Sequence, residues 1–196
     1  MFSIKRSLFS VSAILMAGIF LAGCGNGGSM RTITAEVEGV SGEADAACLY
    51  IDVIGNQANS PLVTTEVKGD RFTLELPETV DTKLLRPVSS IIGGGDGATI
   101  SDLSAKACEA TIEGLKDGSI AGRFCYERDD NALYAETYIF YVDKDVDITG
   151  TNEDGTKYSC NLKKGWNFVA DIMHMQGNDP NEMTTILPEG LMWDFY

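Results

Sequence analysis

The sequence predicts an all-β protein with little helix, folded as a two-sheet antiparallel sandwich of about nine or ten strands. From Arg31 onward the chain consists of short runs in which apolar and polar residues alternate, and glycine, proline or aspartate separates the runs. No amphipathic helical pattern of useful length interrupts them. Because alternation puts the apolar side chains on one face of each strand, a second sheet is needed to cover that face.

The N-terminal half begins with two strands and a predicted hairpin. Residues 32–39 and 48–55 each alternate, and residues 61–78 predict two paired strands that turn at Lys68-Gly69-Asp70 and stop at Pro77. The side chains expected to point inward are Ile33, Ala35, Val37, Leu49, Ile51, Val53, Phe72, Leu74 and Leu76.

Residues 78–98 break this pattern. They predict a turn of helix before Pro87 and then a glycine-rich surface loop. The loop lacks a Gly-Lys-Ser/Thr ending and a long helix after it, so it does not fit a phosphate-binding loop. We expect this segment to mark a seam between an N-terminal and a C-terminal set of strands within one domain, residues 32–196.

The C-terminal half returns to alternation. Residues 105–115 and 119–129 predict a hairpin around Lys116-Asp117-Gly118, and residues 132–150 predict one long strand or a strand with a bend. Residues 156–175 predict two more strands joined at Lys164-Gly165. Residues 191–196 predict an edge strand that closes the sandwich.

The first 23 residues have the pattern of a cleaved export signal. Lys5 and Arg6 precede a mostly apolar stretch, residues 8–21, that is too short to span a membrane comfortably. The stretch ends in Leu21-Ala22-Gly23-Cys24, which resembles the lipobox of bacterial lipoproteins. That resemblance implies cleavage before Cys24 and lipid on its thiol and new amino group, which would anchor the protein to a membrane. The alternative is an ordinary secretory signal with a cysteine there by chance.

The residues after Cys24 indicate a destination. Residues 24–31 are a glycine-rich, flexible tether, and Gly25 stands where an inner-membrane retention signal would have aspartate. We therefore expect the outer membrane, on its periplasmic face or at the cell surface. The formal charge of −14 becomes −16 once Lys5 and Arg6 are removed, and such an acidic chain is a poor partner for nucleic acid.

Four cysteines remain after Cys24, and an even number in an exported chain favours two disulfides, with three possible connectivities. If a four-residue loop joins the strands of the 105–129 hairpin, Cys108 faces Cys125 closely enough to bridge. The expected pairs are then Cys108–Cys125 and Cys48–Cys160. Buried free thiols are the alternative.

Three blocks of the sequence carry a resemblance to a known class. They are GDRFTLELPETV (residues 69–80), YVDKDVDITG (141–150) and YSCNLKKGWNFV (158–169). Together they resemble small β-sandwich surface lipoproteins of gut-dwelling Gram-negative anaerobes, and the first block is similar to transthyretin-like modules. The resemblance implies an exported transthyretin-like or Ig-like sandwich in a class mostly of unknown function, and it brings no catalytic residue with it.

Asp143, Asp145 and Asp147 occupy every other position and raise the question of calcium. An EF-hand does not fit, because its turn glycine is replaced by Ile148 and its last ligand by Asp154. In an extended strand the three aspartates share one solvent-facing side and repel one another mildly. A calcium ion bound outside an EF-hand, or the opposing Lys163 and Lys164, could relieve that repulsion. We expect no other cofactor.

The remaining candidates are a histidine and a set of tyrosines. His174 is the only histidine and has methionines on both sides, so a catalytic base there has little support. Tyrosines in the C-terminal strands can either reach an exposed sheet face that suits carbohydrate or protein, or pack across strands in the core. They are Tyr126, Tyr134, Tyr138 and Tyr141.

The sequence therefore predicts a lipid-anchored, non-enzymatic binding or structural module of the cell envelope that contacts protein or glycan. Two alternatives stay open. One is a small hydrolase acting on glycans through paired carboxylates, for which the sequence gives no spacing rule. The other is a fimbria-like subunit assembled by strand exchange.

Overall fold

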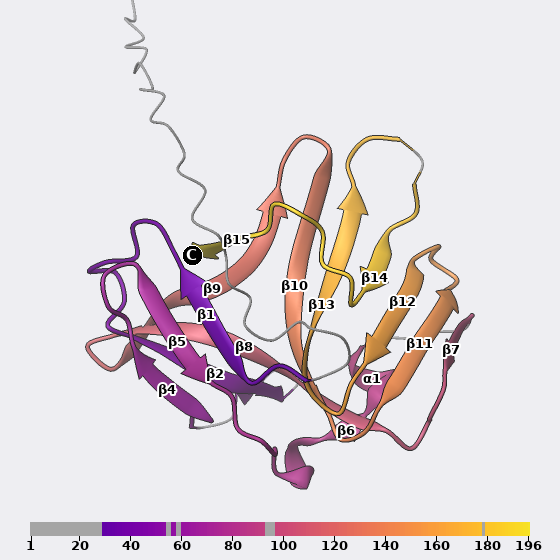
Figure 1. Ribbon diagram of the computed structural model, residues 1–196, viewed down its shortest axis with the longest axis horizontal. Coiled ribbons are helices and arrows are strands. Elements are labelled where there is room, and N and C mark those ends of the chain that lie inside the picture. Colours follow the sequence, from indigo (N-terminus) through magenta and orange to yellow (C-terminus); the bar gives the residue numbers. More distant parts are fainter. Residues whose placement is uncertain (1–28, 54–55, 58–59, 93–96, 178) are drawn as a thin grey trace, which may run out of the picture.

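The computed structural model describes residues 29–53, 56–57, 60–92, 97–177 and 179–196, and these residues form an almost entirely β protein (Figure 1). The first elements are β1 (Thr32–Glu36), β2 (Ala46–Val53), β3 (Asn56–Gln57), β4 (Val63–Glu66), β5 (Arg71–Glu75), η1 (Thr82–Leu84), β6 (Arg86–Pro87), α1 (Val88–Ile91) and β7 (Ala98–Ile100). The others are β8 (Lys106–Lys116), β9 (Ser119–Asp129), β10 (Leu133–Val142), β11 (Val146–Thr151), β12 (Lys157–Leu162), β13 (Gly165–His174), β14 (Glu182–Thr184) and β15 (Met192–Phe195).

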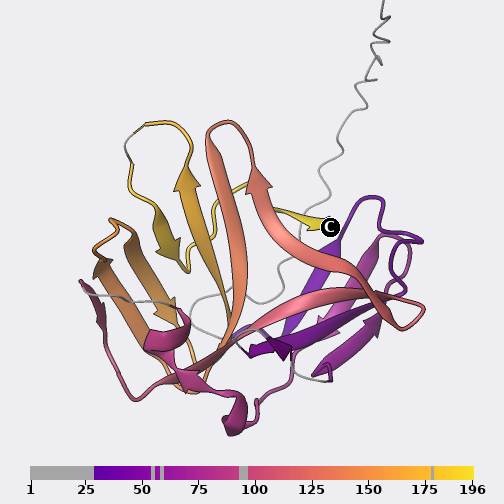
Figure 2. The same ribbon diagram turned by 180° about the vertical axis from the view of Figure 1, so that it is seen from behind.

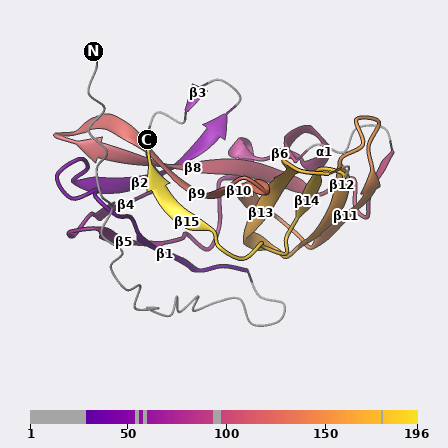
Figure 3. The ribbon, with the colours of Figure 1, turned by 90° about the horizontal axis from the view of Figure 1, so that it is seen from above.

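The strands form two sheets in a sandwich-like arrangement, which confirms the predicted all-β fold class. β1 and β5 make a two-stranded sheet, and the other strands make a thirteen-stranded one (Figure 3). The large sheet runs β3-β2-β8-β9-β10-β13-β14-β12-β11-β7, with β4 on β2, β6 on β8 and β15 on β9. Its pairings are antiparallel except for β12 with β14.

The predicted strand number is too low, since the described residues carry fifteen strands. The additional strands are mainly short ones of two or three residues, such as β3, β6, β7 and β14. A run that short contains at most one alternation of apolar and polar residues, so it has no period that a sequence pattern can reveal.

The predicted hairpin over residues 61–78 is wrong in its pairing. Both strands form, but β4 pairs with β2 whereas β5 pairs with β1. A tight turn bridged by Lys68 and Arg71 carries the chain from the large sheet to the small one. The alternating burial of β5 then places Phe72 and Leu74 against the large sheet, because the small sheet buries only its inner face.

Two clusters of buried side chains lie on opposite faces of the large sheet. The first, between the two sheets, includes Leu49, Ile51, Phe72, Leu74, Ile112, Phe124, Tyr141 and Trp166. The second includes Val88, Ile92, Ala107, Phe140, Val142, Ile148, Leu162 and Val169. Along β10, Tyr141 packs in the first cluster while Phe140 and Val142 pack in the second, so this strand is covered on both faces.

The segment expected to be a seam closes the second cluster. Its predicted turn of helix is the 3-10 turn η1, and the one-turn helix α1 follows Pro87. Leu85 packs in the first cluster, and Val88 and Ile92 pack in the second. Residues 93–96 of the glycine-rich loop lie outside the described residues. Within the described part, no helix has the length and apolar character needed to cross a membrane.

Candidate functional site

The large sheet contains a junction at which three strands exchange partners. β8 pairs with β9 over residues 112–116 and with β10 over residues 107–110. β10 also pairs with β9, over residues 134–136. From their common turn, β8 and β9 diverge as they approach β10 (Figure 2). We call this junction the fork.

A pocket of about 40 Å³ lies at the fork. Thr111, Cys125 and Tyr138 line it, and the ladders between the three strands are interrupted around these positions. Next to the pocket, the hydroxyl of Thr137 donates a hydrogen bond of 2.8 Å to the backbone carbonyl of Tyr126. The remaining lining residues are Glu109, Ala110, Ile112, Arg123, Phe124, Tyr126, Glu136, Thr137, Ile139 and Trp193.

Carboxylates gather on one face of the sheet around this pocket. Glu136 of β10 lies directly opposite Glu127 of β9 on one side and Asp171 of β13 on the other. Glu109 of β8 lies directly opposite Asp52 of β2. Like charges facing each other across strands are destabilising, so the sheet holds these groups together at an energetic cost.

The environment shifts the proton affinity of two of these groups. Burial raises the pKa of Glu109, and the neighbouring Asp52 and Glu136 raise it further, while Arg123 opposes the shift. Burial also raises the pKa of Asp171, with Glu136 as the second cause. Both side chains are only half-buried, which means that solvent still reaches them.

Two tyrosines flank Glu136. The hydroxyls of Tyr134 and Tyr138 donate to its Oε2 at 3.4 and 3.3 Å. Burial and the charges of Glu136 and Glu127 raise the pKa of Tyr134 to about 12. The pKa of Tyr138 is also raised, by burial first and then by Glu136. Both tyrosines therefore stay protonated and act as hydrogen-bond donors at neutral pH.

Other carboxylates on this face have partners of their own. Arg123 Nε lies 3.3 Å from the buried Glu113 Oε1, and the hydroxyl of Tyr196 donates to Glu127. Glu109 and Glu136 are the carboxylates that line the pocket itself.

Thr111 carries a further unusual feature. Its residue is only 9% exposed, and its Oγ1 is the single buried side-chain polar atom among the described residues with no hydrogen-bond partner. Since Thr111 alternates with Ala110 and Ile112, its side chain points to the same face as Glu109. A buried hydroxyl without a partner costs free energy, and this one lines the pocket.

The four predicted tyrosines separate into two pairs. Tyr126 and Tyr141 are buried. Tyr126 stacks on Trp193 with ring centroids 4.9 Å apart, and Tyr141 meets Trp166 edge-on with ring centroids 5.3 Å apart. These two belong to the core. Tyr134 and Tyr138 are half-buried on the carboxylate face, and Tyr138 also packs against the second cluster, beside Phe140.

The structure does not bring Asp143, Asp145 and Asp147 together as a shared strand face. β11 begins only at Val146, which leaves Asp143 and Asp145 in the preceding turn. Asp143 accepts from the amide of Lys106, Asp145 from that of Lys164, and Asp147 from the side chain of Asn161. The described residues contain no group of three acidic, histidine or cysteine side chains placed to hold a metal ion.

The predicted disulfides are not formed, and Cys48, Cys108, Cys125 and Cys160 are free thiols. The turn of the hairpin has two residues, Asp117 and Gly118, and a bulge follows beyond Leu115. The register then puts Cys108 in the first core cluster and Cys125 on the carboxylate face, on opposite sides of the sheet. Cys48 and Cys160 lie on different strands, beside Thr64 and Met183.

Two further predictions have plain outcomes. His174 lies half-buried at the end of β13, opposite Leu133, and does not line the fork pocket. Cys24 lies outside the described residues.

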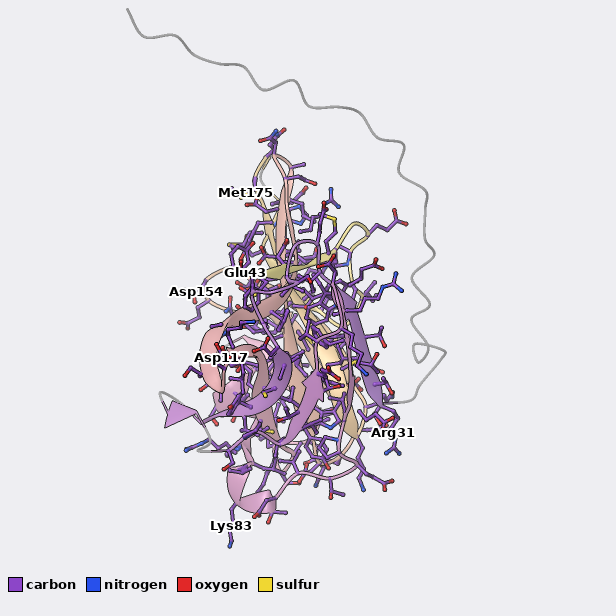
Figure 4. The ribbon with its side chains drawn as sticks, turned by 90° about the vertical axis from the view of Figure 1, so that its left-hand side faces the viewer. Arg31, Glu43, Lys83, Asp117, Asp154 and Met175 are labelled. Carbon is purple, nitrogen blue, oxygen red and sulfur yellow. The ribbon has the colours of Figure 1, made fainter. Side chains whose placement is uncertain are left out.

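A separate, open hollow is lined by Asp129, Asp130, Asn131, Met175 and Gln176. Met175 lies at one far tip of the molecule, opposite Lys83 (Figure 4).

Sequence patterns alone do not reveal Glu109, Thr111, Arg123, Cys125 and Glu136 as neighbours. The available signal is the alternation of Glu109, Thr111 and Glu113 with apolar residues. In the predicted hairpin Cys125 faces Cys108 and so lies on the other side of the sheet from Thr111, and only the bulge brings the two to one face. The fork depends on β10 changing its partner from β9 to β8, which the alternation of a single strand does not indicate.

The fork thus combines hydrogen-bond acceptors, tyrosine donors and an apolar lining, which is an arrangement suited to binding. Comparison with known proteins finds no match: no family model, no curated protein and no solved structure is significantly similar to this chain. The resemblance to β-sandwich surface lipoproteins therefore remains a prediction.

Proposed function

We propose that this protein is an outer-membrane lipoprotein whose mature domain is a non-enzymatic binding module of the cell envelope. The anchor is Cys24, on the strength of the lipobox-like residues 21–24. The module contacts protein or glycan through the carboxylate face around the fork. The observation that carries this proposal is the set of half-buried carboxylates and tyrosines around a pocket that contains an unpartnered buried hydroxyl.

This face differs from an ordinary solvated sheet surface. A solvated face gains nothing from placing like charges opposite one another, yet Glu136 has an acidic residue opposite it on both neighbouring strands. Tyr134 and Tyr138 add aromatic area with a polar tip, which is the side-chain type that recurs in binding surfaces. Ionisable groups perturbed by burial and by one another are typical of functional sites.

The glycan-active hydrolase is the second candidate. Glu109, with its raised pKa, lies near Glu136, and a glycosidase needs such a protonated acid beside a second carboxylate. The pocket that Glu109 and Glu136 line has a volume of about 40 Å³. Clefts that bind small molecules have volumes of about 300–1,000 Å³, so this pocket is too small to enclose a sugar. Binding is therefore favoured over hydrolysis.

The fimbria-like alternative gains no observation in its favour. Strand exchange requires a core strand that lacks a partner on one side. Within the described residues, β2, β8 and β10 are each paired on both sides, so the central strands leave no groove for a donated strand.

A photo-crosslinking amino acid placed at Tyr138 in living cells tests the proposal. If this face binds an envelope component, irradiation should produce adducts heavier than the protein itself, of protein or of glycan. Asp154 is the matched control, because it is exposed and lies away from the fork. Absence of adducts at position 138, or equal adducts at position 154, would exclude this face as the contact surface.

A further inference from the structure

We propose that the fork pocket receives a primary ammonium group, the head of a lysine side chain presented by a partner protein. This inference rests on the proposed binding function and names its ligand. It follows from the charge around the pocket, the polar atoms that line it, and its size.

The carboxylate face is strongly negative, because its acidic residues outnumber its basic ones. Around the pocket, strand alternation and register bring Asp52, Glu109, Glu113, Glu127, Glu136, Asp171 and Asp194 to this face, together with the cation Arg123; Arg86 reaches the same face farther along β8, opposite Ala107. Arg123 is already paired with Glu113. A cation bound between Glu109 and Glu136 would reduce the repulsion that each carboxylate experiences from its cross-strand neighbour.

The polar atoms of the pocket suit an ammonium group in number and kind. Lysine presents three N–H donors and no acceptor. The residues that line the pocket include three acceptors on the carboxylate face without a hydroxyl hydrogen committed elsewhere, namely the carboxylates of Glu109 and Glu136 and the hydroxyl of Thr111. The hydroxyl of Thr111 is buried without a partner, and an ammonium donor would satisfy it.

The size of the pocket separates this ligand from others. A cavity of about 40 Å³ accepts an ammonium head with part of its methylene stem, whereas a sugar ring needs more room. The stem would leave the pocket on the carboxylate face, beside Tyr138. The described residues hold no trio of ligands for a metal ion, so a metal is a poorer fit.

Titration of the full-length protein in a neutral detergent at low salt tests the inference. The probe is Nα-acetyl-lysine N-methylamide, followed by amide chemical shifts at Thr111 and Glu136. We expect saturable shifts that weaken with added salt, and no saturable shifts with the Nε-acetylated probe, which has the same stem but no charge. Butylamine distinguishes a lysine of a partner protein from a free amine. If butylamine binds as tightly as the lysine probe, the assignment to a protein lysine is overturned.

Two variants locate the site. Thr111→Val removes an unpartnered hydroxyl at nearly constant shape, so it should fold and bind the probe about tenfold more weakly. Glu136→Gln should weaken binding by at least as much, and Asp154→Asn should leave it unchanged. Equal binding by all variants, or no binding by the wild type, overturns the proposal. If the probe fails while crosslinking at position 138 succeeds, only the lysine assignment is wrong; if both fail, so does the binding function.

Discussion

At the scale of single residues, Glu109 shows how the fold stores electrostatic strain. Its carboxylate is half-buried, faces Asp52 across the strands and lies near Glu136, and its pKa is raised above the ordinary 4.5. A carboxyl group whose pKa is higher in the folded state binds protons more tightly when folded. At pH values above that raised pKa, the ionised Glu109 therefore lowers the free energy of unfolding. The penalty declines as pH falls through the raised pKa and is absent below the unfolded value.

Glu109→Gln should make the protein more stable at pH 7, by about 0.2–1 kcal/mol, because it removes one of two opposed like charges. The gain should disappear towards pH 4, where the wild-type carboxyl is itself protonated. Chemical denaturation at both pH values measures this, with Glu75→Gln on the exposed face of β5 as the control. A gain of equal size at both pH values would contradict the electrostatic explanation.

At the scale of elements, the docking of β15 depends on two glycines in the β8–β9 hairpin. β15 pairs with β9, and backbone hydrogen bonds between Arg123 and Tyr196 extend the ladder by one residue. A Cβ at Gly122 would overlap the carbonyl oxygen of Tyr196, and a Cβ at Gly114 would overlap the ring of Phe195. These glycines are therefore needed for close approach, as neither is at positive φ.

Gly122→Ala should displace β15 and destabilise the protein by about 1–3 kcal/mol, because a backbone carbonyl cannot move aside as a flexible side chain can. Faster amide hydrogen exchange at residues 192–196 would report the displacement. Gly39→Ala is the matched control, since its Cβ would enter open space and it is strained only by its φ of +80°. It should destabilise without changing exchange in β15, and a Gly122 variant that behaves likewise would refute the steric account.

Alternation in the sequence predicted which residues form strands, but it did not predict which strands pair. The patterns over residues 32–39, 105–129 and 191–196 correspond to β1, to β8 and β9, and to β15. The Cys108–Cys125 bridge failed for a physical reason, since a two-residue turn and one bulge shift the register and put these cysteines on opposite faces. The fork could not be predicted either, because β10 pairs first with β9 and then with β8, and alternation along one strand carries no sign of such a change of partner.

At the scale of the whole molecule, the described part of the fold has a polar face around the fork and three buried clusters, of which the two largest are joined through shared strands. β8 and β10 contribute to both clusters, so the two sides of the large sheet do not form separate units. The formal charge of −14 keeps such a body hydrated and opposes association with anionic lipid headgroups. Stable residence at a membrane would then depend on the lipid proposed for Cys24.

Cys24→Ala should release the protein from membranes into the soluble fraction, since several acyl chains on one cysteine anchor stably and their loss leaves an acidic body with no other attachment that we propose. Fractionation followed by immunoblotting measures the distribution. A Cys125→Ala variant is the control, because it removes a thiol from the folded domain and should remain membrane-bound. Continued membrane association of the Cys24 variant would show that the lipoprotein proposal is wrong.

The pairing of β15 with β9 also affects how the chain reaches its native state. Phe195 aligns with Phe124, so the ladder closes only after two segments far apart in the sequence have met. Closing so large a loop is entropically costly before its contacts form, and folds dominated by such contacts fold slowly. We therefore expect the chain to stay incompletely folded until residues 192–195 are available, which would keep it extensible during the export that we propose.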